Sequence, residues 1–249
     1  MYGLEIKIFD SSDDLYNYTA GLLSRTIKDS SLYRKHSSIA LSGGTSPMRL
    51  YGIMGDFGGP DNIEWENVHL FWGDERCVPP DDKMSNYGSA ISSLISKGNI
   101  PSDNIHRIRG ELGPEDGARD YEMRLREFFN DSLFPEFDVI LLGLGEDAHT
   151  ASLFPGSEAL REDEHWVTGV RRDNGPDRIT LTIPSINNAN TIIFIVTGIE
   201  KAEAVSDVFF KTPDPEIYPA QAIKPAKGNV YWVLDRDAAS VYLQRSSKA

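Results

Sequence analysis

The residue whose surroundings most strongly indicate chemistry is His149. It follows Asp147 by two positions in the segment GLGEDAHTASLFPG, residues 143–156, directly after a very apolar stretch of the chain. A histidine can accept and return a proton near neutral pH, which the hydrolysis of an ester requires twice. A neighbouring carboxylate can fix its tautomer and stabilise the imidazolium. We therefore expect His149 to be an acid–base catalyst oriented by Asp147, with a purely structural loop histidine as the alternative.

A second candidate is the glycine-rich segment SGGTSP, residues 42–47, between a predicted strand and a predicted helix. Glycines let the backbone approach a ligand closely, and the free N–H groups at a helix start favour an anion such as phosphate. The segment has neither the lysine of a P-loop nor the third glycine of a dinucleotide fingerprint. An ordinary strand-to-helix turn is the alternative. The candidate anion-binding residues here are Ser42, Gly43, Gly44 and Thr45.

Positive charge for the same anion could come from basic residues near other strand ends. Arg76 ends the segment FWGDER, residues 71–76, in which the two preceding acidic residues could orient it. Lys201 lies in the predicted first turn of a helix, where the helix dipole disfavours a cation unless an anion binds there. Arg172 and Arg178 are weaker candidates. A surface ion pair or a solvated lysine are the competing interpretations.

Alternating strands and helices must position these residues. Periodicity predicts strands at 4–9, 38–41, 68–72, 137–142, 166–170, 179–183, 191–197 and 230–234. It predicts helices beginning at 15, 47, 85, 114 and 201. Such alternation indicates an α/β fold with a mostly parallel sheet, because strands joined through helices form βαβ units. A Gly-Pro turn near Arg178 adds a small β region, and we expect one domain covering residues 1–249.

Composition excludes several classes of function. The 249 residues include 25 basic and 38 acidic ones, so the net charge of −13 argues against nucleic-acid binding. No apolar run reaches the roughly 20 residues that a membrane span needs, and the N-terminus does not have the pattern of a secretory signal. The single cysteine, Cys77, cannot form an internal disulfide, which favours a cytoplasmic location. Neither metal-ligand spacing nor a G-x-S-x-G nucleophile motif occurs.

Several segments together resemble the 6-phosphogluconolactonase family. SGGTSP is similar to that family's phosphate loop, FWGDER to its WGDER segment, and GLGEDAHTASLFPG to its most specific signature. RITLTIP (residues 178–184), TGIEKAEA and YPAQAIKP (residues 218–225) also match in order. The resemblance extends from Ser38 to about Ala239. One departure is Ala148, which replaces the family's glycine and whose Cβ restricts positive φ.

The resemblance implies a three-layer α/β/α fold with a Rossmann-like sheet, as in sugar-phosphate isomerases. It implies hydrolysis of 6-phospho-D-glucono-1,5-lactone to 6-phospho-D-gluconate in the oxidative pentose phosphate pathway, with no metal or cofactor. His149 would activate water against C1 and then protonate the departing ring oxygen, and Asp147 would orient it. The phosphate would bind Gly43, Gly44, Thr45, Arg76 and Lys201, with Arg172 and Arg178 as further helpers. The expected assembly is a monomer or a small homo-oligomer.

Two rival functions are compatible with parts of this pattern. Glucosamine-6-phosphate deaminases share the glycine loop and the Asp-x-His arrangement, but they carry a catalytic glutamate before a proline where this chain has Phe154. Non-catalytic sugar-phosphate sensors on the same fold usually carry a DNA-binding segment, for which this chain has neither the spare length nor a basic patch. The sequence therefore favours the lactonase.

Overall fold

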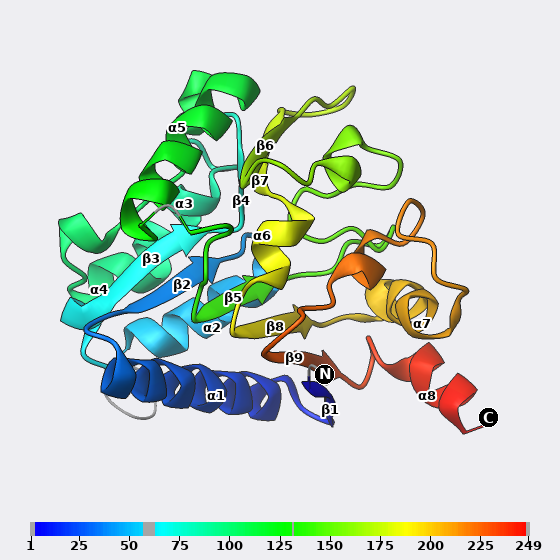
Figure 1. Ribbon diagram of the computed structural model, residues 1–249. Coiled ribbons are helices and arrows are strands. Elements are labelled where there is room, and N and C mark those ends of the chain that lie inside the picture. The colour runs from blue at the N-terminus through cyan, green and yellow to red at the C-terminus, as the bar shows by residue number, and fades with distance from the viewer. Residues whose placement is uncertain (1–2, 57–62, 131, 248–249) are drawn as a thin grey trace.

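The central feature of the computed structural model, which describes residues 3–56, 63–130 and 132–247, is a six-stranded sheet (Figure 1). Every neighbouring pair of its strands is parallel. All residues of the inner strands β2, β5 and β8 are buried, as expected where helices cover both faces. In spatial order the strands are β1 (Gly3–Phe9), β9 (Asn229–Asp235), β8 (Thr191–Val196), β5 (Val139–Leu142), β2 (Ser37–Leu41) and β3 (Val68–Trp72).

Helices cover both faces of this sheet. Consecutive strand side chains point to opposite faces, and Trp72 packs against Tyr87 of α3 whereas Phe71 packs against Phe128 of α5. The layer with α3 contains α1 (Ser12–Tyr33), α2 (Thr45–Gly55), α3 (Asn86–Ala90), a π-helical turn (Ile91–Ile95) and α4 (Ser96–Gly98). The opposite layer contains α5 (Pro114–Phe128) and α7 (Ala202–Phe210), on which α8 (Ser240–Ser246) packs. The three-layer α/β/α arrangement is confirmed.

A second, smaller sheet is antiparallel and consists of β4 (Asp74–Arg76), β7 (Arg178–Leu181) and β6 (Val167–Val170). Gly73 connects it to the main sheet, because its N–H donates to Leu41 O at 2.9 Å while its carbonyl accepts from Leu181 N at 2.8 Å. The additional β region predicted near the Gly-Pro turn is confirmed. The strand β4 was not predicted, because its three residues continue the preceding strand in the sequence.

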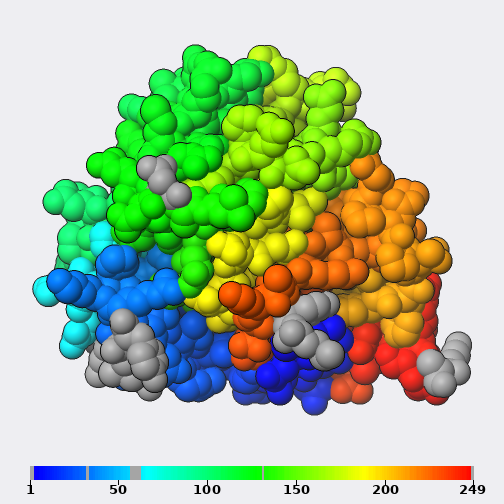
Figure 2. Space-filling view, viewed as in Figure 1, coloured from blue at the N-terminus to red at the C-terminus, as the bar shows by residue number. Residues whose placement is uncertain are grey.

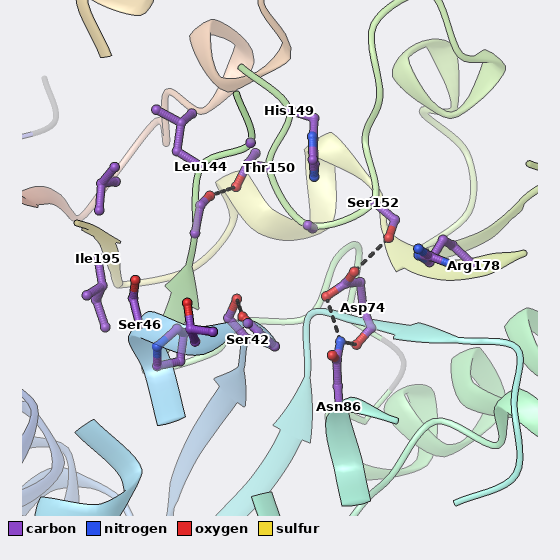
Figure 3. Close-up of a pocket in the computed structure, with 18 of the residues that line it drawn as sticks. Ser42, Ser46, Asp74, Asn86, Leu144, His149, Thr150, Ser152, Arg178 and Ile195 are labelled. Atoms are coloured by element: carbon purple, nitrogen blue, oxygen red, sulfur yellow. Dashed lines mark hydrogen bonds between the residues drawn. The ribbon is translucent and has the colours of Figure 1, made fainter. Parts of the chain in front are cut away.

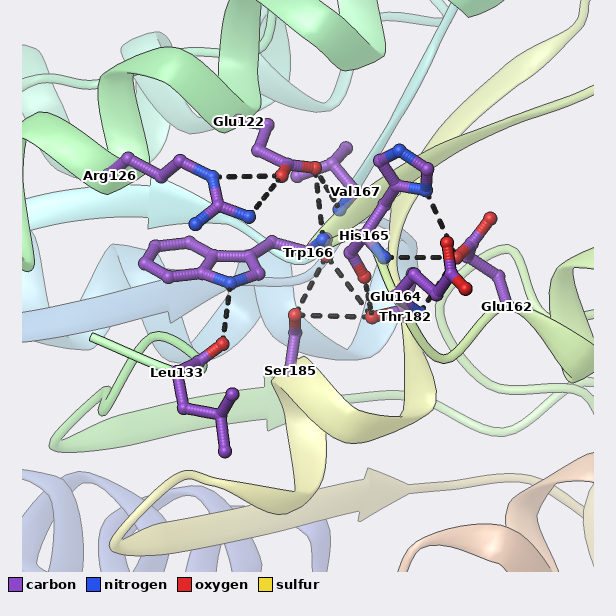
Figure 4. Close-up of polar contacts among 10 residues, drawn as sticks. All are labelled: Glu122, Arg126, Leu133, Glu162, Glu164, His165, Trp166, Val167, Thr182 and Ser185. Carbon is purple, nitrogen blue, oxygen red and sulfur yellow. Dashed lines mark hydrogen bonds and ion pairs between the residues drawn. The ribbon is translucent and has the colours of Figure 1, made fainter. Parts of the chain in front are cut away.

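Trp166, directly before β6, anchors the small sheet to α5 (Figure 4). Its indole N–H donates to Leu133 O at 2.9 Å, and its backbone N–H donates to the Glu122 carboxylate at 2.9 Å. Arg126 bonds the same carboxylate and lies over the indole ring at 4.5 Å. The small sheet is thereby held at a fixed position against the main one.

The strand predicted at 179–183 is wrong at its end. β7 stops at Leu181, and Ile183 already begins the short helix α6 (Ile183–Asn187). Pro184 explains the change, because a proline at the first turn of a helix needs no N–H partner but would interrupt a sheet ladder. Other predicted bounds agree within about three residues, although the predicted helix from 85 contains a π-helical turn.

Both sheets and their helices share one contiguous cluster of buried apolar side chains. Figure 2 shows the N-terminal segment in blue against the orange and red C-terminal segments at one edge of the molecule, as the pairing of β1 with β9 requires. Within the described ranges, no helix is both long and apolar enough to span a bilayer.

Candidate functional site

A cavity of about 410 Å³ opens where β2, β5 and β8 end (Figure 3). The strand that follows β2 in the sheet along the chain, β3, lies on one side of it, whereas the strand that follows β5, β8, lies on the other side. This reversal of strand order between β2 and β5 is where open α/β sheets bind ligands. Nine predicted site residues line the cavity, namely Ser42, Gly43, Gly44, Thr45, Arg76, His149, Arg172, Arg178 and Lys201. The tenth, Asp147, contacts His149 from outside it.

His149 and Asp147 form a close pair in the loop after β5. The Nδ1 atom of His149 lies 2.5 Å from Asp147 Oδ1, and the same oxygen accepts the backbone N–H of His149 at 3.2 Å. The bond from the imidazole, more than any other contact, lowers the pKa of Asp147 to about 2. The carboxylate is therefore ionised at neutral pH and favours the proton on Nδ1. This leaves Nε2 as the free basic nitrogen, on a ring that points into the cavity in Figure 3.

The backbone of this loop is shaped around the imidazole. Gly145 N–H donates to His149 O at 2.8 Å, and a Cβ atom at Gly145 would lie only 2.0 Å from His149 Nδ1. Ala148 has a φ of 62° and Ala151 a φ of 48°, both in the left-handed region. The expected restriction by the Cβ of Ala148 does not prevent positive φ there, although the conformation costs alanine about 1–2 kcal/mol. Backbone strain of this kind is concentrated at functional sites.

The glycine-rich loop after β2 presents backbone groups to the cavity. Gly44 precedes the first residue of α2 with a φ of 98°, and no side chain caps the helix start. Gly43 packs so tightly that a Cβ atom would lie 1.8 Å from Asn86 Oδ1. The buried hydroxyl of Tyr51 accepts from Ser42 N at 2.9 Å and donates to Ser42 O at 2.7 Å. The loop is thus held with the N-terminus of α2 open to an anion.

Four cations line the same cavity as this helix start and have no carboxylate partner. Among the described residues, no carboxylate lies within ion-pair distance of Arg76, Arg172, Arg178 or Lys201, whereas every other arginine except Arg25 forms an ion pair. Burial, followed by the charges of Arg76 and Arg172, lowers the pKa of Arg178. In a chain of net charge −13, four cations without ion pairs, of which Arg76 and Arg172 repel Arg178, indicate an anion-binding site.

The two acidic residues before Arg76 do not orient its side chain as expected. The Arg76 guanidinium instead donates to Met84 O at 2.6 Å. Glu75 is buried and accepts the backbone N–H groups of Asn86 and Tyr87 at 2.7 and 2.8 Å, so it fixes the start of α3. Burial raises the pKa of Glu75, against the opposing effect of these bonds.

Asp74 instead links neighbouring segments of the cavity wall through hydrogen bonds, which the sequence did not predict. Ser152 Oγ donates to its carboxylate at 2.6 Å, and Asn86 Nδ2 donates to it at 3.2 Å (Figure 3). These three residues line the cavity and tie the His149 loop to β4 and α3. They come from segments far apart in the chain, and no spacing signal links them.

Lys201 differs slightly from its predicted place. It ends a 3-10 turn (Ile199–Lys201) and precedes α7 instead of lying within its first turn. Its side chain still lines the cavity. Within the part of the chain that the structure describes, no three His, Cys, Asp or Glu side chains gather as a metal site would require.

Comparisons with known proteins agree with this geometry. The family described as glucosamine-6-phosphate isomerases/6-phosphogluconolactonase matches residues 10–232. The 6-phosphogluconolactonase of Nostoc sp. is 41% identical over 206 residues, covering 82% of this chain and 83% of the relative. That of Synechocystis sp. is 42% identical over 208 residues, covering 82% and 84%.

A solved structure leads to the same grouping. The 6-phosphogluconolactonase from Trypanosoma cruzi superposes with a TM-score of 0.83 at 27% identity, covering 96% of this chain and 97% of its own. The family match spans both the glycine-rich loop and the His149 loop. The chain therefore belongs to the family of glucosamine-6-phosphate isomerases and 6-phosphogluconolactonases.

Proposed function

We propose that this protein hydrolyses 6-phospho-D-glucono-1,5-lactone to 6-phospho-D-gluconate. The observation that carries the proposal is a single cavity in which a carboxylate-paired histidine faces four cations without ion pairs. The histidine would provide acid–base chemistry, and the four cations would bind a phosphate. Relatives over 40% identical that are named 6-phosphogluconolactonase support the same substrate.

In the proposed mechanism His149 acts twice. Its Nε2 atom takes a proton from a water molecule whose oxygen attacks C1 of the lactone, and a tetrahedral oxyanion forms. The oxyanion then collapses, the bond between C1 and the ring oxygen breaks, and the imidazolium returns its proton to that oxygen. Asp147 holds the imidazole by Nδ1 and stabilises the imidazolium between the two transfers. A positioned base of this kind contributes about 10²–10⁴-fold to the rate.

The phosphate group would bind at one wall of the cavity, which includes the N-terminus of α2. The N-terminus of α2 offers the backbone N–H groups of Gly44 and Thr45, and Arg76, Arg178 and Lys201 supply positive charge. Phosphate binding at this wall would present C1 to His149. The binding energy of the phosphate then orients the lactone, and orientation of the reacting groups can lower a reaction barrier by as much as about 7–11 kcal/mol.

With this substrate the reaction belongs to the oxidative pentose phosphate pathway, and we place it in the cytoplasm. The proposed chemistry requires no metal or cofactor, because His149 generates the nucleophile itself. We also propose one domain over residues 1–249, since both sheets share one core. We propose that it acts as a monomer or a small homo-oligomer.

The test is the disappearance of 6-phosphogluconolactone, generated in situ at neutral pH with EDTA present and spontaneous hydrolysis subtracted. Rapid enzyme-dependent decay is expected, and His149→Ala should lower kcat by about 10²–10⁴-fold while 6-phosphogluconate still binds. A near-normal kcat in this variant would remove His149 from the mechanism. Decay at the background rate would refute the proposed function, and ammonia released from glucosamine 6-phosphate in a parallel assay would then identify a deaminase.

A further inference from the structure

The ring of Phe154 contacts both halves of the site. Its centroid lies 4.6 Å from that of the His149 imidazole, and the guanidinium carbon of Arg172 lies 3.7 Å from the ring centroid. Phe154 is buried and lines the cavity. We propose that Phe154 is a positioning residue, whose aromatic ring fixes the His149 base and the Arg172 cation relative to each other. The inference rests on the proposed lactone hydrolysis and deepens it.

The imidazole needs a second constraint besides its hydrogen bond. Asp147 holds Nδ1, but one bond leaves the ring free to rock about that contact, and 30% of the His149 side chain is exposed. The Phe154 ring packs against the imidazole at an interplanar angle of 44°. Aromatic rings that pack at such a centroid distance attract each other. The ring therefore limits the directions in which Nε2 can point.

The guanidinium of Arg172 needs support of another kind. No carboxylate among the described residues pairs with it, its Nε atom is buried without a partner, and its charge acts unfavourably on Arg178. The backbone of Arg172 is tied down by a bond to Asp177, but that bond does not reach the side chain. A guanidinium on an aromatic face is attracted to the ring and keeps its N–H edges free for an anion. Phe154 thus aims Arg172 at the cavity.

Phe154 can do this because its own segment is rigid. Leu153 N–H donates to Thr150 O at 3.0 Å, and Ser157 N–H donates to Phe154 O at 3.1 Å. Ser152 is bonded through its hydroxyl to Asp74, and its N–H donates to Thr180 of the small sheet at 3.2 Å. The ring therefore stands on a frame that is connected to two strands of the small sheet, β4 and β7.

The experiment compares Phe154→Met, which fills similar volume without a ring, with Phe154→Tyr, which keeps the ring face. Both are assayed on 6-phosphogluconolactone and on unphosphorylated glucono-1,5-lactone, and 6-phosphogluconate binding is measured by calorimetry. Phe209→Met is the matched control, because Phe209 of α7 packs against Trp232 of β9 and Tyr242 of α8 and does not line the cavity.

For Phe154→Met we expect kcat to fall about 10–100-fold on both lactones, because the base is misplaced. We expect KM and the Kd of 6-phosphogluconate to rise about 5-fold, with KM for the unphosphorylated lactone changed less than about twofold. Phe154→Tyr should stay within about threefold of the parent, and Phe209→Met within about twofold.

The proposal is overturned if Phe154→Met keeps kcat on both lactones and the Kd of 6-phosphogluconate within about twofold of the parent. If Phe154→Met does not fold by circular dichroism, Arg172→Lys decides, because lysine keeps the charge but loses the planar face. It should raise KM for the phosphorylated lactone only, and an unchanged KM overturns the proposal. If the parent enzyme opens no lactone, the proposed function fails, whereas the binding experiment still tests the contact of Phe154 with Arg172.

Discussion

Replacing Gly145 by alanine should damage catalysis through one well-defined collision. A Cβ atom there would lie 2.0 Å from His149 Nδ1, 2.3 Å from Cε1 and 2.6 Å from Asp147 Oδ1. Gly145 is not among the glycines with positive φ, so the backbone itself can accept alanine. Contact between such atoms is comfortable at about 3.5 Å, so the imidazole must move by roughly 1.5 Å.

The size of the effect follows from that displacement. A misplacement of about 1 Å in a catalytic group can cost about 10²-fold in rate, so kcat should fall by roughly 100-fold, or about 2.7 kcal/mol of transition-state stabilisation. The three atoms nearest the added Cβ belong to His149 and Asp147 and to none of the four unpaired cations, so KM should stay within about threefold. Overpacking should lower the free energy of unfolding by about 1–3 kcal/mol. Part of this loss is offset because alanine gives the unfolded chain less conformational entropy than glycine does.

The assay is steady-state lactone hydrolysis for the parent, Gly145→Ala and the control Gly73→Ala. Gly73 also follows a buried strand and has no positive φ, but a Cβ there would meet only Leu41 O at an ordinary 3.6 Å. The control should keep kcat within about threefold. If Gly145→Ala keeps kcat at the level of Gly73→Ala while both remain folded, the argued position of the His149 ring is wrong.

Two further predictions concern protonation. Asp147→Asn should lower kcat by about 10²–10⁴-fold with little change in melting temperature. The amide can donate to Nδ1, which leaves the proton on Nε2, the nitrogen that must act as the base. An activity within about tenfold of the parent would show that Asp147 does not select the tautomer. The second concerns His69 and His106, whose Nδ1 and Nε2 atoms lie 3.0 Å apart. Burial, followed by the charge of His69, lowers the pKa of His106 to about 4. Burial, followed by the charge of His36, lowers the pKa of His69. Since the unfolded chain binds these protons near pH 6.5 and the folded chain does not, stability should fall as pH drops from about 6.5 to 4, by about 1–2 kcal/mol after allowance for partial exposure. Urea unfolding of the parent and of His106→Phe should show the smaller loss in the variant, and equal losses would contradict this assignment.

Much of the fold can be predicted from the sequence because burial leaves a local pattern. The stretch at 137–142 is apolar almost throughout, as a strand covered on both faces must be, and it forms the buried strand β5. The end of β7 was predicted wrongly, because Ile183 suits either element and only Pro184, in the first turn of α6, decides between them. The strand β4 and the helix α8 were missed because each is short and carries little periodic signal.

By itself the sequence determined the residue types of the site and the strand ends that carry them. Asp147 and His149 are two positions apart, so their contact is a local property of one loop, and the glycines at 43 and 44 mark a close backbone approach. Only the tertiary structure decided which distant residues join them. Arg172 reaches the cavity from the loop between β6 and β7, and its guanidinium carbon lies 3.7 Å from the ring centroid of Phe154. Contacts of this kind depend on how two sheets pack and on which side chains lack a partner. The spacing of residues along the chain predicts neither of these.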